Sequence, residues 1–244
     1  MRTLHIIMPM AGEGSRFRKE GWTIPKPLIA IKGEHLFFRA IKSIIFDDLI
    51  DIKYSFIVRE EHIINYKIDY QIKKQIPNAS IFSIIETTRG AVETCLYAEN
   101  NIDDNDAIIV MDCDLEFKSN EYNKFIKSSL NCDINSPLGG VLLSFESELP
   151  KYSYAEIDQN GNVIKTAEKE VISNNALCGA YFFHSGKDFK DVAHELLNDN
   201  RFNKPEFYVS LLYNYLIKKG KTIKLAKIDK YYSYGTPEEI SKYL

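Results

Sequence analysis

The residues best suited to chemistry lie near the start of the chain, directly after a short apolar run. That run, Leu4–Met8, predicts a buried strand. Gly12 and Gly14 follow in a loop whose consecutive N–H groups can form an anion-binding concavity. Arg16 adds a planar guanidinium for phosphate oxygens, and Lys26 stands between two prolines that keep its backbone out of a regular helix. One strand, one glycine loop and two placed cations predict a site for a triphosphate.

Two better-known phosphate-binding loops do not match this segment. Phe17 stands where the third glycine of G-x-G-x-x-G belongs, and no Gly-Lys-Ser/Thr follows the loop. A purely structural explanation is a glycine turn between strand and helix with a surface lysine in a proline-rich bend. The two placed cations favour binding over that explanation.

A pair of carboxylates follows another buried strand. Ala107–Met111 is a continuous apolar run, and Asp112 and Asp114 come directly after it, with Cys113 between them. Side chains alternate along a strand, so both aspartates are expected to point the same way, about 7 Å apart. Oxygen ligands at the carboxyl end of a strand suit Mg²⁺. A capped turn is the alternative.

Taken together, Ala11–Phe17 and Pro25–Leu28 resemble the signature of the bacterial sugar-phosphate nucleotidyltransferases, or pyrophosphorylases. The pattern looks closest to a capsule-associated branch that includes CTP:phosphocholine and CTP:phosphoglutamine cytidylyltransferases. The resemblance implies transfer of a nucleoside monophosphate, CMP from CTP as the first choice, to a small phosphomonoester with release of pyrophosphate. It implies Mg²⁺ as cofactor and surface polysaccharide (capsule) biosynthesis as the setting.

The resemblance also implies roles for single residues. Lys26, Arg16 and Asp114 would be catalytic, and Asp114, helped by Asp112, would hold the metal. The nucleotide would be bound by the glycine loop, the two cations, the segment before the next helix and one aspartate: Ala11, Gly12, Glu13, Gly14, Ser15, Arg16, Lys26, Thr88, Gly90 and Asp112. Thr88 and Gly90 are also explained as a helix N-terminus.

For the acceptor, the resemblance points to Glu168, Lys169 and Gly179. An ordinary solvated charge pair is the alternative for the first two. The chain departs from the family pattern in two places: Glu170 replaces a proline, and Ser233 stands where many relatives carry a second metal-binding aspartate. A hydroxyl is a poor Mg²⁺ ligand, so the second protein ligand is left open.

Composition restricts the remaining possibilities. The chain has 244 residues, a formal net charge of -3 and four scattered cysteines without metal-ligand spacing. A broad nucleic-acid-binding surface is therefore not expected, and reduced thiols fit the cytoplasm. No signal peptide and no apolar run of the roughly 20 residues that span a bilayer are visible. We expect a cytoplasmic protein without a membrane partner, whose oligomeric state, a homo-oligomer included, is left open.

The elements alternate as strand and helix through the first half. This order predicts an α/β fold with a doubly wound, Rossmann-like, mixed but mostly parallel sheet, whose ligands bind outside the carboxyl ends of the strands. Asn160-Gly161 between two β runs predicts a small hairpin excursion. Helices are expected over Leu36–Phe46, His62–Gln75 and Phe207–Lys219, and a capping box of Thr236 and Glu239 over a short terminal helix. We expect a single domain, with a nucleotide and metal half at about residues 1–135 and an acceptor half at about 136–244.

Three other functions stay open. One is a sugar-1-phosphate thymidylyl-, uridylyl- or guanylyltransferase. Another is a GT-A-like glycosyltransferase, which also uses an Asp-x-Asp motif but has no need for the glycine loop and Lys26. The third is a catalytically inactive nucleotide-binding regulator, which Glu170 and Ser233 keep under consideration.

Overall fold

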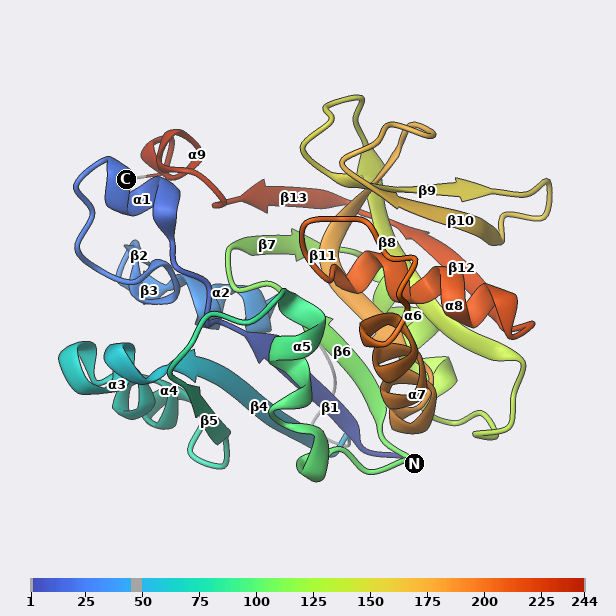
Figure 1. Ribbon diagram of the computed structural model, residues 1–244, viewed down its shortest axis with the longest axis horizontal. Coiled ribbons are helices and arrows are strands. Elements are labelled where there is room, and N and C mark those ends of the chain that lie inside the picture. Colours follow the sequence, from blue (N-terminus) through green and yellow to red (C-terminus); the bar gives the residue numbers. More distant parts are fainter. Residues whose placement is uncertain (1, 45–49, 244) are drawn as a thin grey trace.

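The computed structural model describes residues 2–44 and 50–243 and has a central sheet with helices on both faces (Figure 1). Nine strands of the described residues form this sheet: β1 (Leu4–Pro9), β4 (Ile52–Arg59), β5 (Ser80–Ile84), β6 (Ala107–Met111), β8 (Leu138–Glu146), β9 (Ser153–Ile157), β10 (Val163–Glu168), β11 (Asn175–Phe183) and β12 (Thr222–Lys227). Two small antiparallel pairs stand apart from it, β2 (Ala30–Ile31) with β3 (Glu34–His35) and β7 (Leu115–Lys118) with β13 (Lys230–Ser233).

The helices vary in length. The α-helices are α1 (Ser15–Lys19), α2 (Leu36–Lys42), α3 (Glu60–Tyr66), α4 (Ile68–Gln75), α5 (Ala91–Leu96), α6 (Asn120–Ser129), α7 (Gly186–Leu197), α8 (Leu212–Lys218) and α9 (Pro237–Ser241). Short 3₁₀ turns occur at η1 (Lys26–Leu28), η2 (Glu99–Asn101) and η3 (Val209–Leu211). The predicted helix over Leu36–Phe46 is confirmed as α2 in its first part, and residues 45 and 46 lie outside the described residues.

The core of the sheet is parallel. β1 pairs with β4 and β6, and β4 pairs with β5, all in parallel register. Side chains of β1 alternate between the two faces: Leu4 and Ile6 pack with α2, α4 and α6, whereas Ile7 packs with α5, α7 and α8. Helices cover both faces of the sheet, which explains why β1 and β6 are mainly apolar along their whole length. The predicted doubly wound α/β fold is confirmed.

The second half adds antiparallel strands. β11 pairs antiparallel with β8 on one side and with β6 and β9 on the other, and β12 pairs parallel with β8. The predicted hairpin is confirmed as β9–β10. Its turn is wider than a two-residue turn, because the Asp158 N–H donates to the Asn162 carbonyl at 2.8 Å while Gly161 takes a φ of 75°.

Two predicted helices differ in the structure. His62–Gln75 is split into α3 and α4 by Lys67, whose φ is 53°. The helix predicted over Phe207–Lys219 begins later, after η3, because the backbone of Phe207 is bonded elsewhere. Its N–H donates to the Arg89 carbonyl at 2.9 Å, and its carbonyl accepts from the Val92 N–H at 3.1 Å. These hydrogen bonds hold the segment before α8 extended.

The end of the described chain returns to the glycine loop. Figure 1 shows α9 beside α1 although they lie at opposite ends of the sequence. Tyr234 and Ile240 form a small core with Phe17 of α1, and Trp22 packs against it. The glycine loop is therefore supported from behind by the segment 234–240.

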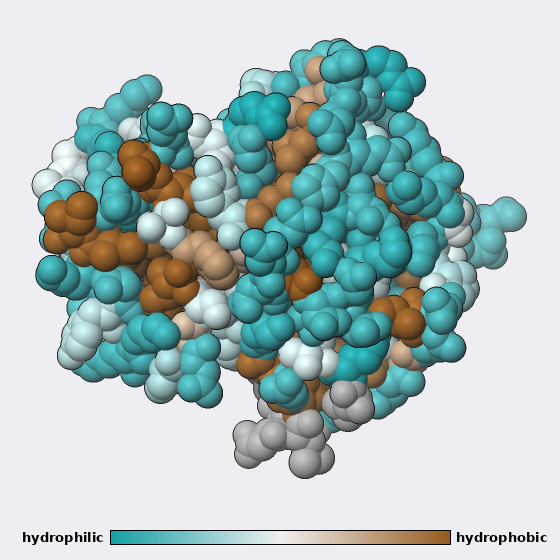
Figure 2. Space-filling view, turned by 60° about the horizontal axis from the view of Figure 1, so that its bottom comes forward, coloured by the Kyte–Doolittle hydropathy of each residue, from teal (hydrophilic) through white to brown (hydrophobic). Residues whose placement is uncertain are grey.

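No helix in residues 2–44 and 50–243 is long and apolar enough to cross a bilayer. The face shown in Figure 2 is covered mainly by hydrophilic residues, with apolar residues gathered chiefly at one end.

Candidate active site

The glycine loop, Lys26 and the two aspartates meet in one cavity. β1 ends at Pro9, and the loop passes Gly12 and reaches α1 through Gly14, whose φ of 63° favours glycine. This glycine-loop cavity, about 220 Å³, is lined by Pro9, Met10, Gly12, Gly14, Lys26, Pro27, Asp112, Cys113 and Asp114. Three segments far apart in sequence thus converge at the carboxyl ends of β1 and β6, where an open α/β sheet binds its ligands.

Lys26 is held by Asp114. Its Nζ donates to Oδ2 of Asp114 at 2.8 Å, and neither side chain is more than a third exposed. Burial alone would lower the pKa of Lys26, but the attraction of Asp114 and of neighbouring Asp112 outweighs it and raises the pKa above its ordinary value. The amine is therefore protonated at neutral pH, and it lines the glycine-loop cavity.

Asp112 occupies a tighter place than Asp114. Burial, and then repulsion by Asp114, raise the pKa of Asp112 to about 7. The strand β11 lies directly behind it: the N–H of Asp112 donates to the Gly179 carbonyl at 2.7 Å. A Cβ on Gly179 would stand 1.9 Å from Oδ2 of Asp112. The lack of a side chain at Gly179, a predicted acceptor residue, is thus required by the aspartate.

A second cavity opens beyond the aspartates. This cleft cavity has a volume of about 290 Å³. Besides the aspartates, it is lined by four site residues that the sequence predicts: Arg16, Glu168, Lys169 and Gly179. Further lining residues come from both halves of the chain and include Lys151, Tyr152, Ser153, Tyr181, Tyr208, Tyr231, Ser233 and Glu239. Asp112 and Asp114 line both cavities. The two cavities therefore share one wall.

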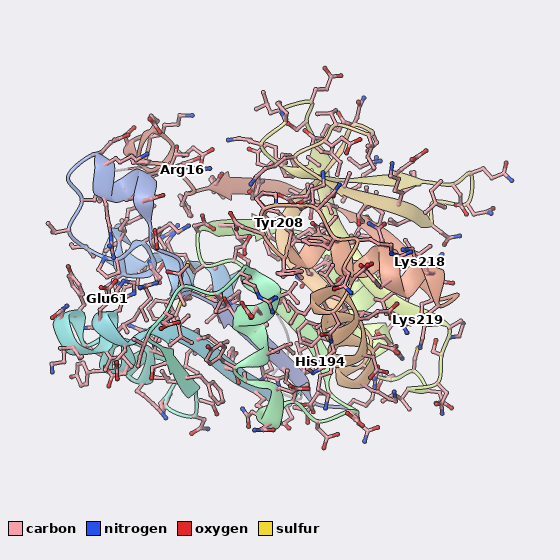
Figure 3. All side chains as sticks on the ribbon, viewed as in Figure 1. Arg16, Glu61, His194, Tyr208, Lys218 and Lys219 are labelled. Carbon is pink, nitrogen blue, oxygen red and sulfur yellow. The ribbon has the colours of Figure 1, made fainter. Side chains whose placement is uncertain are left out.

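Arg16 lies in the cleft cavity and not in the glycine-loop cavity. Figure 3 shows it on the side of α1 toward β13. Of the other predicted loop residues, Ala11 is buried, Ser15 begins α1, and Glu13 accepts a hydrogen bond from Thr87 at 3.0 Å. These three residues line neither the glycine-loop cavity nor the cleft cavity, so their roles stay predictions.

Glu168 and Lys169 do not form the solvated charge pair that was the alternative explanation. The carboxylate of Glu168 is buried, and its Oε2 accepts hydrogen bonds from the hydroxyls of Ser153 and Ser210, the latter at 3.0 Å. Lys169 instead donates from Nζ to the Tyr208 hydroxyl at 2.8 Å. One acidic and one basic group thus line the cleft cavity as separate polar groups.

The predicted nucleoside residues have structural partners of their own. Thr88 Oγ1 lies 2.6 Å from Thr94 Oγ1 and donates to the Gly90 carbonyl at 3.2 Å, whereas α5 begins after Gly90 without a side-chain cap. A Cβ on Gly90, whose φ is 146°, would stand 2.5 Å from the backbone nitrogen of Phe207. A glycine is therefore required at position 90 because the backbone of Phe207 passes close to it. Neither Thr88 nor Gly90 lines the two cavities. Their contact with a nucleoside stays a prediction.

A carboxylate from another residue, Glu239, lies beside Ser233. Ser233 Oγ donates to Oε2 of Glu239 at 2.7 Å, the Gly235 N–H donates to the same oxygen at 2.9 Å, and Lys151 Nζ donates to Oε1 at 2.6 Å. The predicted capping box is half correct: Thr236 Oγ1 accepts from the Glu239 N–H at 3.3 Å, but the glutamate side chain turns to Gly235 and not to Thr236. Sequence analysis assigned Glu239 only to helix capping and missed its place in the cleft.

The donor set fits a metal shared with a substrate. In the described residues no group of three or more His, Cys, Asp or Glu side chains could hold a metal ion alone. Asp112 and Asp114 nevertheless offer two carboxylates at one wall of the glycine-loop cavity. Mg²⁺ is commonly held by one or two carboxylates together with substrate phosphates. These aspartates would hold it when a nucleotide supplies the remaining oxygens.

Comparison with known proteins agrees with this geometry. The family model described as nucleotidyl transferase matches residues 4–223, so the chain belongs to the nucleotidyl transferase family. A search of curated proteins found no match.

Among solved structures, the nucleoside-diphosphate-sugar pyrophosphorylase from Vibrio cholerae RC9 is 26% identical, with a TM-score of 0.82, over 98% of this chain and 99% of that chain. A candidate glucose-1-phosphate thymidylyltransferase from Bacillus anthracis, solved in complex with a sucrose, is 19% identical, with a TM-score of 0.76, over 99% of this chain and 94% of that one; at this identity it shows the shared fold.

Proposed function

We propose that the protein transfers a nucleoside monophosphate, CMP from CTP as the first choice, to a small phosphomonoester and releases pyrophosphate. The observation that carries the proposal is the shared wall of the two cavities. A cradle of glycine backbone with Lys26 lies on one side of Asp112 and Asp114, and a cleft with Glu168 and Lys169 lies on the other. Two phosphate-bearing substrates can meet at that wall.

The residues suit an in-line displacement at the α-phosphorus. An oxygen of the acceptor phosphate forms the new P–O bond while the bond to the leaving pyrophosphate breaks, and the acceptor needs no general base because it is already an anion. The N–H groups of Gly12 and Gly14 would hold the leaving phosphates in the glycine-loop cavity, and Arg16 would approach them from the cleft cavity, which it lines. Lys26 would neutralise charge that develops between donor and acceptor. Mg²⁺ held by Asp114 and Asp112 would supply further charge neutralisation at the phosphate oxygens.

The acceptor and the base are the finer part of the proposal. The resemblance to the capsule-associated branch supports CTP and an acceptor such as phosphocholine or phosphoglutamine, with the product used in capsule assembly from the cytoplasm. The names of the structural neighbours support a sugar 1-phosphate acceptor with a thymidylyl, uridylyl or guanylyl donor at least as well. The cleft cavity has both acidic and basic groups, which is compatible with hydroxyl-bearing and amine-bearing phosphomonoesters.

A coupled pyrophosphate-release assay with Mg²⁺ tests the proposal. It crosses CTP, UTP, dTTP, GTP and ATP with sugar 1-phosphates, phosphocholine and phosphoglutamine. Release that requires one triphosphate and one acceptor supports the transferase and identifies both substrates. Triphosphate binding without release, measured by thermal stabilisation, supports an inactive regulator, and use of an NDP-sugar as donor supports a glycosyltransferase; either result contradicts the proposal.

A further inference from the structure

Two consecutive residues, Glu168 and Lys169, line the same cleft cavity. In a regular strand they would point to opposite faces. β10 ends at Glu168, and Lys169 takes a φ of 56°, which redirects the chain so that both side chains reach the cleft. A left-handed backbone at a residue other than glycine costs about 1–3 kcal/mol and persists where the surroundings impose it. The Lys169 N–H, which donates to the Tyr152 carbonyl at 3.0 Å, is part of those surroundings.

The amine of Lys169 is fixed by one aromatic side chain. Its Nζ donates to the hydroxyl of Tyr208 at 2.8 Å and lies 4.7 Å from the centre of the same ring. In the described part of the chain no carboxylate forms an ion pair with Lys169. A neutral hydroxyl therefore orients the amine and leaves its charge available for an anion. A free lysine side chain would lose about 2 kcal/mol of rotamer entropy on being held in this way.

Tyr208 is itself held from both sides of the cleft. The backbone of the preceding Phe207 is bonded to the turn that begins α5, and the absence of a side chain at Gly90 makes room for it. Two residues further on, Ser210 Oγ donates to Glu168. Figure 3 shows Tyr208 between the two halves of the molecule, whereas Lys218 and Lys219 lie at the far end of α8. The segment 207–210 thus joins the nucleotide half to Glu168 and Lys169.

We infer that Tyr208 is a positioning residue for the acceptor: its hydroxyl holds Lys169 in the direction in which the amine binds the acceptor phosphate. The inference rests on the proposed function. It assigns a role to a residue that the sequence predicts only as part of a helix over Phe207–Lys219.

Steady-state kinetics of Tyr208→Phe test the inference, with the acceptor that the wild-type protein uses in the substrate panel. The variant keeps the ring and removes one hydrogen bond to a charged group, so KM for the acceptor should rise about tenfold. KM for the triphosphate should stay within twofold. The matched control is Tyr215→Phe on α8, outside the cleft, which removes a hydroxyl that donates to Asp199 at 2.8 Å. Both KM values of this control should stay within twofold of wild type. An acceptor KM of Tyr208→Phe within twofold of wild type, or an equal rise in both KM values, overturns the inference.

A second measurement is independent of turnover. Lysines are labelled by reductive ¹³C-methylation, the Lys169 resonance is identified by its loss in Lys169→Arg, and its titration is followed by NMR. Burial lowers the pKa of Lys169, but the hydrogen bond of Tyr208, followed by the charges of Glu168 and Glu206, raises it above its ordinary value.

The titration midpoint of Lys169 should therefore fall in Tyr208→Phe and stay unchanged in the control. An unchanged midpoint in Tyr208→Phe overturns the inference. A lowered midpoint in a protein whose wild type transfers nothing supports the hold on Lys169 and assigns the failure to the proposed function.

Discussion

Replacing Lys26 by alanine tests the proposed role of its amine in neutralising charge that develops between donor and acceptor. Its amine lies 2.8 Å from Asp114 and shares the glycine-loop cavity with the backbone of Gly12 and Gly14. A fixed donor that acts on charge developing in the transition state is worth about 10²–10³ in kcat, or about 2.7–4 kcal/mol. We therefore expect kcat of Lys26→Ala to fall by about 10²–10³.

The fold should survive this change. The side chains of Lys26 and Asp114 are 29% and 19% exposed, so the ion pair is not fully desolvated. Its loss should lower the free energy of unfolding by about 1 kcal/mol, which corresponds to about 2–4 °C in Tm at this chain length. A larger drop in Tm would mean that part of the activity loss comes from unfolding.

The assay is pyrophosphate release at saturating triphosphate and acceptor, compared among wild type, Lys26→Ala and Lys26→Met, which keeps much of the apolar stem. The control is Lys19→Ala, an exposed lysine of α1 that lines neither cavity. The control should retain wild-type kcat. A kcat for both Lys26 variants within fivefold of wild type would refute the role of Lys26 in charge neutralisation.

Two further predictions follow from buried groups. Gly179→Ala places a Cβ 1.9 Å from Oδ2 of Asp112, so it should displace that carboxylate and lower kcat/KM about 10²-fold; a variant with wild-type kcat/KM would contradict the close fit. Burial lowers the pKa of His5, His62 and His184 below the ordinary value of 6.5. At each of these histidines the unfolded chain then binds more protons than the folded one, so the contribution of the histidines to the free energy of unfolding should be constant above about pH 6.5 and fall as pH drops through the lowered values, by up to about 1.4 kcal/mol per pH unit for each histidine. Urea unfolding of Asp112→Asn at pH 8 and pH 5 measures this change, because the raised pKa of Asp112 acts in the opposite direction in the wild type; equal stability of the variant at both pH values would contradict it.

Much of the nucleotide side could be predicted from the sequence because its signals are local. The local sequence predicts the backbone at each of these places: glycines at the end of an apolar strand, a lysine between prolines, and aspartates after a buried strand. The parallel order of the strands then brings Gly12, Lys26 and Asp114 to one edge of the sheet. Their convergence in one cavity follows from topology.

The acceptor side was harder to predict because its residues come together only through tertiary packing. Glu239 has a local explanation in helix capping, and Tyr208 has one in an amphipathic pattern, so nothing in either segment indicates the cleft. The buried state of Glu168 depends on hydroxyls of Ser153 and Ser210, which lie 15 and 42 residues away in the chain. The extended backbone of Phe207 is likewise imposed by hydrogen bonds to a distant turn.

The central claim is that an acceptor phosphate displaces pyrophosphate at the α-phosphorus of a nucleoside triphosphate. ³¹P NMR of a reaction with the protein, Mg²⁺, the triphosphate and the phosphomonoester follows every phosphorus atom at once. We expect the triphosphate and monoester resonances to be replaced by a pair of coupled diphosphate-diester resonances and an equal amount of pyrophosphate. Appearance of free nucleoside monophosphate or inorganic phosphate with the monoester unchanged, or no change with any pair of substrates, would contradict it.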